Sequence, residues 1–306
     1  MTELDYDGPH TLASSGVVVG VDGSPGSELA VQWAADLALR RGRELQLLHG
    51  MDVSGATRLG GPYQVMTPAI LDTVRMRGRK VLAAAEVLAC TGRPELRVSA
   101  HMYADTGAKL LVDHAARAYA VVLGATGTVG TLGHLGSTLL TVTAHARGNV
   151  VVVRPDPDAD NIVRDSGPVV VGIDGGPVSE PAIAAAFTEA AERGAELVAV
   201  HVWSDWSSGL FADAAPDTLD ELETVEEALL AERLAGWQEK YPEVRVTRRI
   251  YVNEPASRLR EWSAMAQLVV VGNRGRGGFL GLLLGSTAHA LVQHAYCPVM
   301  VVHADQ

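Results

Sequence analysis

Cysteine, basic leaders and long apolar runs are all scarce in this chain. Only two cysteines, Cys90 and Cys297, occur among 306 residues, which argues against the disulfide framework of small secreted proteins. We therefore expect two reduced, buried thiols in a cytoplasmic protein. No apolar run approaches the ~20 residues of a membrane span, and the polar start before Ser15 does not resemble a signal peptide. We expect that start to be disordered.

Positive charge is also in short supply. Lys and Arg number 25 against 36 Asp and Glu, so the formal net charge is −11. Nucleic acids and anionic membranes attract basic surfaces. We therefore expect no nucleic-acid partner and no membrane partner.

What the chain does contain is an internal repeat. The segment GVVVGVDGSPGSELAVQWAA near the start resembles GPVVVGIDGGPVSEPAIAAA in the middle. Three pairs of residues keep one constant spacing: Asp22 with Asp174, Gly42 with Gly194, and His49 with His201. A repeat of this length predicts two homologous domains, 1–155 and 156–306. A Pro- and Asp-rich linker at about 154–167 joins them, because these residues break regular structure.

Each repeat alternates apolar strands with segments of helical spacing. The expected strands are 17–21, 45–50, 96–102, 120–124 and 149–153, then 169–174, 196–203, 244–252, 267–272 and 299–303. In the first repeat, helical spacing covers 26–41, 68–91, 106–117 and 134–146. Continuous Val and Leu runs indicate strands covered on both faces, so we predict an α/β fold with a doubly wound parallel sheet in each domain.

A glycine-rich phrase follows the fourth strand of both repeats. The second copy, LVVVGNRGRGGFLGLLLGST, fits G-x2-G-x9-G-[ST], whereas the first copy, AVVLGATGTVGTLGHLGST, has eight residues in place of nine before its last glycine. A strand, a glycine loop and a helix N-terminus together form a phosphate cradle, because backbone N–H groups and the helix dipole converge there. The alternative is a turn whose glycines only permit tight packing.

An acid ends the first strand of each repeat, at Asp22 and Asp174. Ligands of open α/β sheets bind outside the carboxyl ends of the strands, at the switch point. If the first and fourth strands are neighbours, the acid and the glycine loop share one crevice. The alternative is that both acids are helix N-caps.

These phrases, with GVDGS at the first strand and CPVMVV at the last, resemble the universal stress protein family in its tandem ATP-binding type. The resemblance covers both repeats almost end to end. It implies a flavodoxin-like, five-stranded parallel sheet of order 3-2-1-4-5 in each domain. It also implies ATP, with or without Mg²⁺, in each domain, and pairing of domains and of chains through the fifth strand at 150–153 and 299–302.

The resemblance also implies the residues of each nucleotide site. The acid would lie beside the adenosine, the backbone after the second strand at the adenine edge, and the glycines, hydroxyls and arginines along the ribose and phosphates. In the first domain these are Asp22, Met51, Gly124, Gly127, Gly136, Ser137 and Thr138. In the second they are Asp174, Val202, Gly272, Arg274, Gly275, Arg276, Gly285, Ser286 and Thr287. No residue is assigned as catalytic or as a metal ligand.

The two sites differ in ways that favour the second. The first glycine loop is shorter and uncharged, and ordering it around a ligand costs entropy. The second loop has Arg274 and Arg276, although Gly176 replaces Ser24 and removes one hydroxyl. We therefore expect tighter binding in the second domain.

Two other features have simpler interpretations. His49 and His201 are expected to be packed or water-bonded side chains rather than ligands. The segment 217–237 reads as a helix with Leu222, Val225 and Leu229 on one apolar stripe and a solvated acidic face.

Three functional classes remain open. The first is a nucleotide-binding regulatory protein of the stress or growth-arrest response, acting through an unidentified protein partner. The second is an enzyme such as a weak ATPase, although GxxxxGK[ST] is absent and no nucleophile–base pair is evident. The third is a nucleotide-free interaction scaffold. We expect the first, with slow hydrolysis at most.

Overall fold

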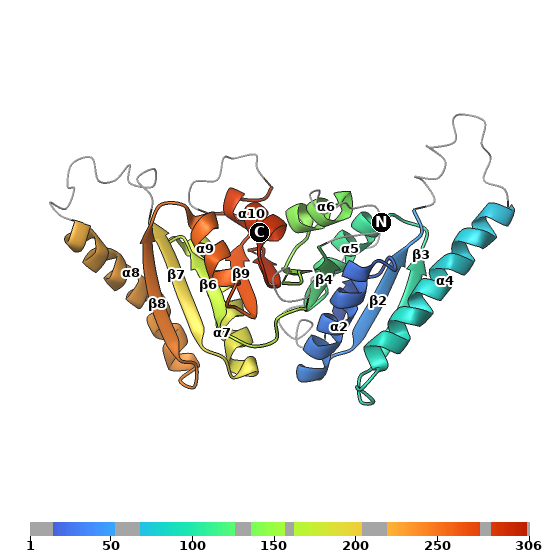
Figure 1. Ribbon diagram of the computed structural model, residues 1–306, viewed down its shortest axis with the longest axis horizontal. Coiled ribbons are helices and arrows are strands. Elements are labelled where there is room, and N and C mark those ends of the chain that lie inside the picture. Colours follow the sequence, from blue (N-terminus) through green and yellow to red (C-terminus); the bar gives the residue numbers. More distant parts are fainter. Residues whose placement is uncertain are drawn as a thin grey trace, which may run out of the picture. The chain divides into compact units, whose positions relative to one another are not determined.

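The computed structural model describes residues 15–52, 68–125, 136–156, 162–203, 219–275 and 283–304. The chain separates into two compact units, which divide between Val153 and Arg154. Figure 1 shows that each unit consists of a sheet with helices packed against it.

The first unit follows the expected alternation closely. Its elements are β1 (Val17–Gly20), α2 (Pro25–Arg40), β2 (Leu45–Gly50), α4 (Pro68–Cys90), β3 (Val98–Tyr103), α5 (Gly107–Ala115), β4 (Ala120–Gly124), α6 (Ser137–His145) and β5 (Asn149–Val153). The strands are parallel and lie in the order β3-β2-β1-β4-β5. Helices α2 and α4 pack on each other, as do α5 and α6, so each pair covers one face of the sheet.

The second unit repeats this order. Its elements are β6 (Val169–Ile173), the 3₁₀ turn η1 (Pro177–Ser179), α7 (Glu180–Arg193), β7 (Leu197–Trp203), α8 (Leu219–Lys240), β8 (Val246–Val252), α9 (Pro255–Ser263), β9 (Leu268–Gly272), α10 (Ser286–His294) and β10 (Val299–Val302). Its sheet is parallel with the order β8-β7-β6-β9-β10. The prediction of two doubly wound α/β domains with strand order 3-2-1-4-5 is confirmed.

The Val-rich central strands explain why each sheet is covered on both faces. Val17, Val18 and Val19 are at most 2% exposed, although consecutive side chains point to opposite faces. Val169, Val170 and Val171 in the second unit are also buried. Burying these side chains on both faces requires a helix layer on each side, and the parallel crossovers provide both layers.

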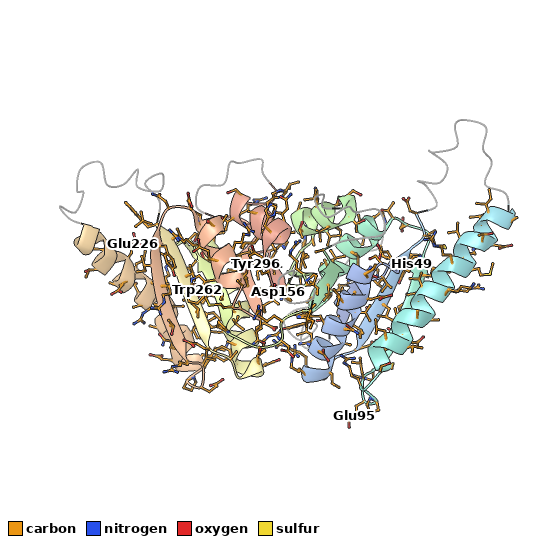
Figure 2. All side chains as sticks on the ribbon, in the orientation of Figure 1. His49, Glu95, Asp156, Glu226, Trp262 and Tyr296 are labelled. Atoms are coloured by element: carbon orange, nitrogen blue, oxygen red, sulfur yellow. The ribbon has the colours of Figure 1, made fainter. Side chains whose placement is uncertain are left out.

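The described part of the linker is more ordered than its composition suggests. Asp156 is 4% exposed, and its N–H donates to the carbonyl of Ile162 at 2.9 Å. The carboxylate of Asp156, a residue labelled in Figure 2, also pairs with Arg164. This short antiparallel bridge satisfies the buried polar groups that an extended linker would have left to water.

One cysteine departs from expectation. Cys297 is buried, as predicted, but Cys90 is exposed. Cys90 is the last residue of α4. The prediction of two buried thiols is therefore wrong for Cys90.

The strand-5 pairing remains a prediction. In their own sheets β5 and β10 are edge strands, and an unpaired apolar edge is a template for association. Within the described ranges no helix is both long and apolar enough to span a membrane.

Candidate functional site

The sheet order creates one switch point in each unit. β1 pairs with β2 on one side and β4 on the other, and β6 lies likewise between β7 and β9. The first and fourth strands of each repeat are therefore neighbours, as the shared crevice requires. In open α/β sheets, ligands bind at such a position, outside the carboxyl ends of the two strands.

Asp22 and Asp174 each hold the loop that follows the first strand. Oδ1 of Asp22 accepts the N–H of Ser24 at 2.9 Å, and Oδ1 of Asp174 accepts the N–H of Gly176 at 2.8 Å. Neither acid is the helix N-cap, because Ser24 caps α2 and Ser179 occupies that position in α7. The N-cap interpretation is therefore wrong, and the carboxylates lie at the carboxyl ends of the strands.

The hydroxyl of Ser24 serves the fold rather than the crevice. Ser24 is 2% exposed, and its Oγ accepts the N–H of Ser27 at 3.1 Å. In the second unit Gly176 replaces Ser24, and a different hydroxyl acts locally: Ser179 Oγ accepts the N–H of Asp174 at 3.0 Å and donates to its carboxylate. The loss of a ligand contact at Gly176 stays a prediction, although the hydroxyl of Ser24 caps α2 in the first unit.

The second glycine loop closes directly beside Asp174. A Cβ placed on Gly275 would lie 3.4 Å from Oδ2 of Asp174. The N–H of Gly285 donates to the carbonyl of Asn273 at 2.7 Å, so the ends of the loop meet. The acid and the loop therefore lie side by side in the second unit, as predicted for neighbouring strands.

In the first unit Gly124, the counterpart of Gly272, is required by helix packing. A Cβ on Gly124 would lie 2.3 Å from both the carbonyl carbon and the oxygen of Gly26, near the start of α2. We had expected the absent side chain to make room for a nucleotide. Instead the end of β4 touches the backbone of α2. Two predicted site residues, Gly127 and Arg276, lie outside the described ranges.

Both glycine loops lead into uncapped helix N-termini. Gly136 precedes α6 and Gly285 precedes α10, and neither has a side chain that accepts the first N–H groups. Ser137 and Ser286 are exposed, and Thr138 and Thr287 are half-buried. Unsatisfied N–H groups and the positive end of the helix dipole suit an anion. Arg274 is exposed at the edge of the second loop.

The predicted adenine-edge residues do not occupy equivalent positions. The N–H of Met51, after β2, donates to the carbonyl of Tyr103 at 2.9 Å. Val202 lies inside β7 opposite Tyr251, which matches Gly50 opposite Tyr103. The counterpart of Met51 is therefore Trp203, the last residue of β7.

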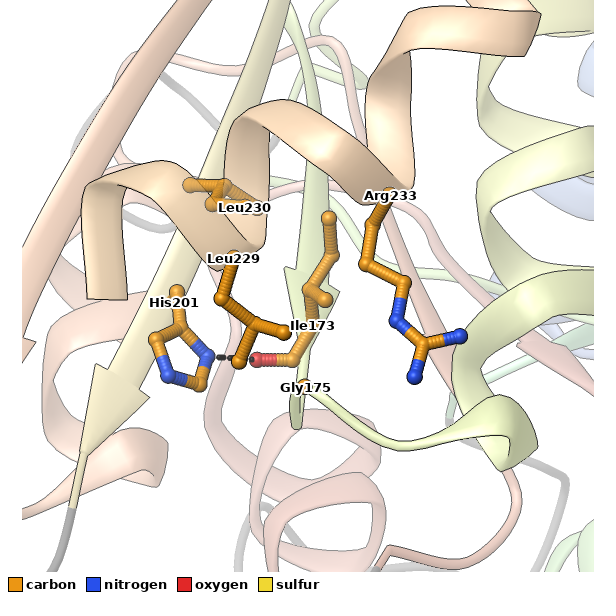
Figure 3. Close-up of a pocket in the computed structure, with 6 residues that line it drawn as sticks. All are labelled: Ile173, Gly175, His201, Leu229, Leu230 and Arg233. Carbon is orange, nitrogen blue, oxygen red and sulfur yellow. Dashed lines mark hydrogen bonds between the residues drawn. The ribbon is translucent and has the colours of Figure 1, made fainter. Parts of the chain in front are cut away.

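The two equivalent histidines make the same contact through Nδ1 but differ in what lies beside Nε2. Nδ1 of His49 lies 2.7 Å from the carbonyl oxygen of Val21, and Nδ1 of His201 lies 2.8 Å from that of Ile173 (Figure 3). Both are packed side chains, as expected. His201 alone also contacts an acid: its Nε2 lies 3.0 Å from Oε2 of Glu226.

The sequence interpretation of α8 missed Glu226. Glu226 is 8% exposed and faces inward with Leu230 and Leu234, whereas Val225, assigned to the apolar stripe, is 50% exposed. The helix buries positions four residues apart, and one of them is acidic. Sequence reasoning could have found Glu226 by asking which residue of this helix faces His201.

Within the described ranges, no group of three or more His, Cys, Asp or Glu residues is placed to hold a metal ion.

Comparison with known proteins agrees with these features. The sequence model of the universal stress protein family matches residues 15–154 and 166–303. A universal stress protein of Mycolicibacterium smegmatis is 42% identical over 295 residues, which cover 94% of this chain and 96% of that protein. Universal stress protein Rv2005c of Mycobacterium tuberculosis is 41% identical over 293 residues, with the same coverage.

A solved structure supports the fold independently of close sequence similarity. The crystal structure of a universal stress protein from Archaeoglobus fulgidus superimposes with a TM-score of 0.68 at 17% identity, covering 95% of this chain and 98% of that one. Two family matches span most of the chain, and the relatives align over nearly their whole length. The chain therefore belongs to the universal stress protein family, in its two-domain form.

Proposed function

We propose that this chain binds adenine nucleotides, ATP in particular, in one crevice per unit. Binding would make it a regulatory protein of the stress or growth-arrest response that acts through a protein partner. The observation that carries the proposal is in the second unit, where the carboxylate of Asp174, the closed loop at Gly275 and the uncapped start of α10 converge.

The chemistry of these groups fits a nucleotide. Backbone N–H groups at a helix start donate to phosphate oxygens, and the dipole favours negative charge there. Arg274, exposed beside the loop, is close enough in sequence to supply a charged donor. Asp174 is half-buried at the end of β6, and its carboxylate is suited to accept hydrogen bonds from ribose hydroxyls. Phosphates would then lie toward α10 and the nucleoside toward β6.

Binding rather than turnover is the expected activity. The carboxylates of Asp22 and Asp174 already accept a backbone N–H in their own loops. That contact engages each carboxylate in holding the shape of its own loop. Any hydrolysis of ATP is therefore expected to be slow.

Calorimetric titration of ligand-stripped protein with ATP, ADP, AMP and cyclic AMP tests the proposal. We expect up to two nucleotides per chain, and a mass spectrum of small molecules released on denaturation should show the physiological one. Absence of binding by all four at millimolar concentration would overturn the proposal and favour a nucleotide-free scaffold.

A further inference from the structure

A chain of two hydrogen bonds links α8 to the end of β6 in the second unit. Oε2 of Glu226 lies 3.0 Å from Nε2 of His201, whose Nδ1 lies 2.8 Å from the carbonyl oxygen of Ile173. The side chains of His201 and Glu226 are only 5% and 10% exposed. Figure 3 shows His201 between α8 and the end of β6, next to a narrow pocket lined also by Leu229 and Leu230.

The acceptors around His201 determine where its protons lie. A carbonyl oxygen only accepts, so Nδ1 must carry hydrogen to donate to Ile173. One more proton must then lie between Nε2 and Glu226, either on the ring or on the carboxyl group. In both forms the pair has no net charge, which is how a buried acid of this kind avoids a large desolvation cost.

The pair fixes two strand ends that border the second crevice. Ile173 directly precedes Asp174, whose Oδ2 lies 3.4 Å from the Cβ position of Gly275. His201 directly precedes Val202, near the end of β7. We propose that Glu226, acting through His201, is a positioning residue for the second nucleotide crevice. This inference rests on the function proposed above.

Among the described residues of the first unit, no acid is hydrogen-bonded to the equivalent histidine, which provides a built-in comparison. Nδ1 of His49 makes the same contact, to Val21 at 2.7 Å. The α4 residue that faces this ring is Gly78, where a Cβ would lie 2.9 Å from Cδ2 and 3.1 Å from Nε2 of His49. The backbone of α4 therefore lies where Glu226 extends its side chain in the second unit, and no acid fits.

The test uses the full chain with one crevice disabled at a time. An Asp22→Ala background reports the second crevice, and an Asp174→Ala background reports the first. In the first of these backgrounds, Glu226→Ala should weaken ATP binding by roughly tenfold, the scale of effects transmitted through a packed neighbour. In the second, affinity should stay unchanged.

Glu226→Gln provides the rescue. The Gln amide donates to Nε2 of a neutral ring whose Nδ1 still donates to Ile173, so both hydrogen bonds survive. Affinity should return to near the wild-type value, whereas Glu226→Met, which keeps the bulk without the hydrogen bond to His201, should bind as weakly as Glu226→Ala. Glu226→Gln also keeps the test valid if Glu226→Ala does not fold.

A readout without nucleotide separates this inference from the proposed function. In the free protein, Glu226→Ala should shift the backbone amide resonances of Asp174, Gly175 and Val202, and Glu226→Gln should largely restore them. If these resonances move while the wild-type protein binds no nucleotide, the proposed function fails and the positioning of the strand ends stands. Unmoved resonances with unchanged affinity in folded Glu226→Ala would overturn the inference.

Discussion

Gly275 and Asp174 lie against each other in the second unit, where a Cβ on the glycine would be 3.4 Å from Oδ2 of the carboxylate. This contact joins the glycine loop after β9 to the acid after β6. The distance is an ordinary van der Waals separation, so a methyl group fits there, whereas the two γ-carbons of valine would project into the crevice.

Gly275→Val should therefore weaken nucleotide binding in the second crevice while the fold survives. The φ angle of Gly275 lies outside the left-handed region, so valine introduces no backbone strain. We expect a loss of at least about tenfold in affinity, with the free energy of unfolding changed by less than ~0.5 kcal/mol. Calorimetry in the Asp22→Ala background measures the affinity.

Gly236→Val is the matched control for that variant. Gly236 lies on α8 with no atom within 4 Å of its Cβ position. The same side chain is added in the same unit, away from the crevice, and affinity should not change. Unaltered binding in a folded Gly275→Val protein would show that the loop is only a connector.

Gly124→Ala should destabilise the first unit far more than Gly272→Ala destabilises the second. A Cβ on Gly124 would lie 2.3 Å from the backbone of Gly26, so α2 and β4 must separate, at a cost of about 1–3 kcal/mol. A Cβ on Gly272 would approach the carbonyl oxygen of Arg274 at 3.1 Å, which a small loop shift relieves. Denaturant unfolding followed by amide resonances of each unit measures both. Equal effects would contradict a packing role for Gly124.

Gly124 and Glu226 show what could and could not be predicted from the sequence. The strand order follows from the uninterrupted Val runs and the family pattern, and it places acid and loop together. The contacts that explain why a particular residue stands at a particular position were harder to predict. Gly124 matches a ligand motif but is required by a backbone approach of α2, a contact between segments far apart in sequence. Glu226 reads as part of a solvated face because periodicity averages over a helix and misses one paired acid.

Ser24→Ala should affect stability without affecting binding. The hydroxyl of Ser24 is buried and accepts the N–H of Ser27 at the start of α2. Loss of such a cap costs about 1 kcal/mol of stability. ATP affinity in the Asp174→Ala background should stay the same. A clear fall in affinity, measured by calorimetry, would mean that the hydroxyl turns to the ligand.

The two cysteines should differ sharply in reactivity. Burial raises the pKa of the Cys297 thiol to about 12, whereas Cys90 is exposed. Iodoacetamide should therefore label only Cys90 in the native protein, since the thiolate is the reactive form, and both residues after denaturation. Mass spectrometry counts the labels, and native labelling of Cys297 would contradict its burial.

The same shift in the pKa of Cys297 predicts the direction of a stability change. The folded state holds the proton more tightly than the unfolded chain, whose thiol has the ordinary value of 9.0. The contribution to stability is complete below pH 9.0 and is lost as pH rises toward 12. Cys297→Ala should remove this alkaline decline in the free energy of unfolding.

The second crevice should fill with ATP before the first. It has the full nine-residue spacer in its glycine loop and two arginines, Arg274 and Arg276, where the first has threonines. A hydrogen bond to a charged group contributes ~1.5–3 kcal/mol, more than the ~0.5–1.5 kcal/mol of a neutral contact from the Ser24 hydroxyl, which already caps α2. One arginine on phosphate therefore favours the second crevice by roughly tenfold. Asp22→Ala and Asp174→Ala, made separately, show which affinity each variant loses. If Asp22→Ala removes the tighter site, the short and uncharged loop is the better cradle, and the ranking is wrong.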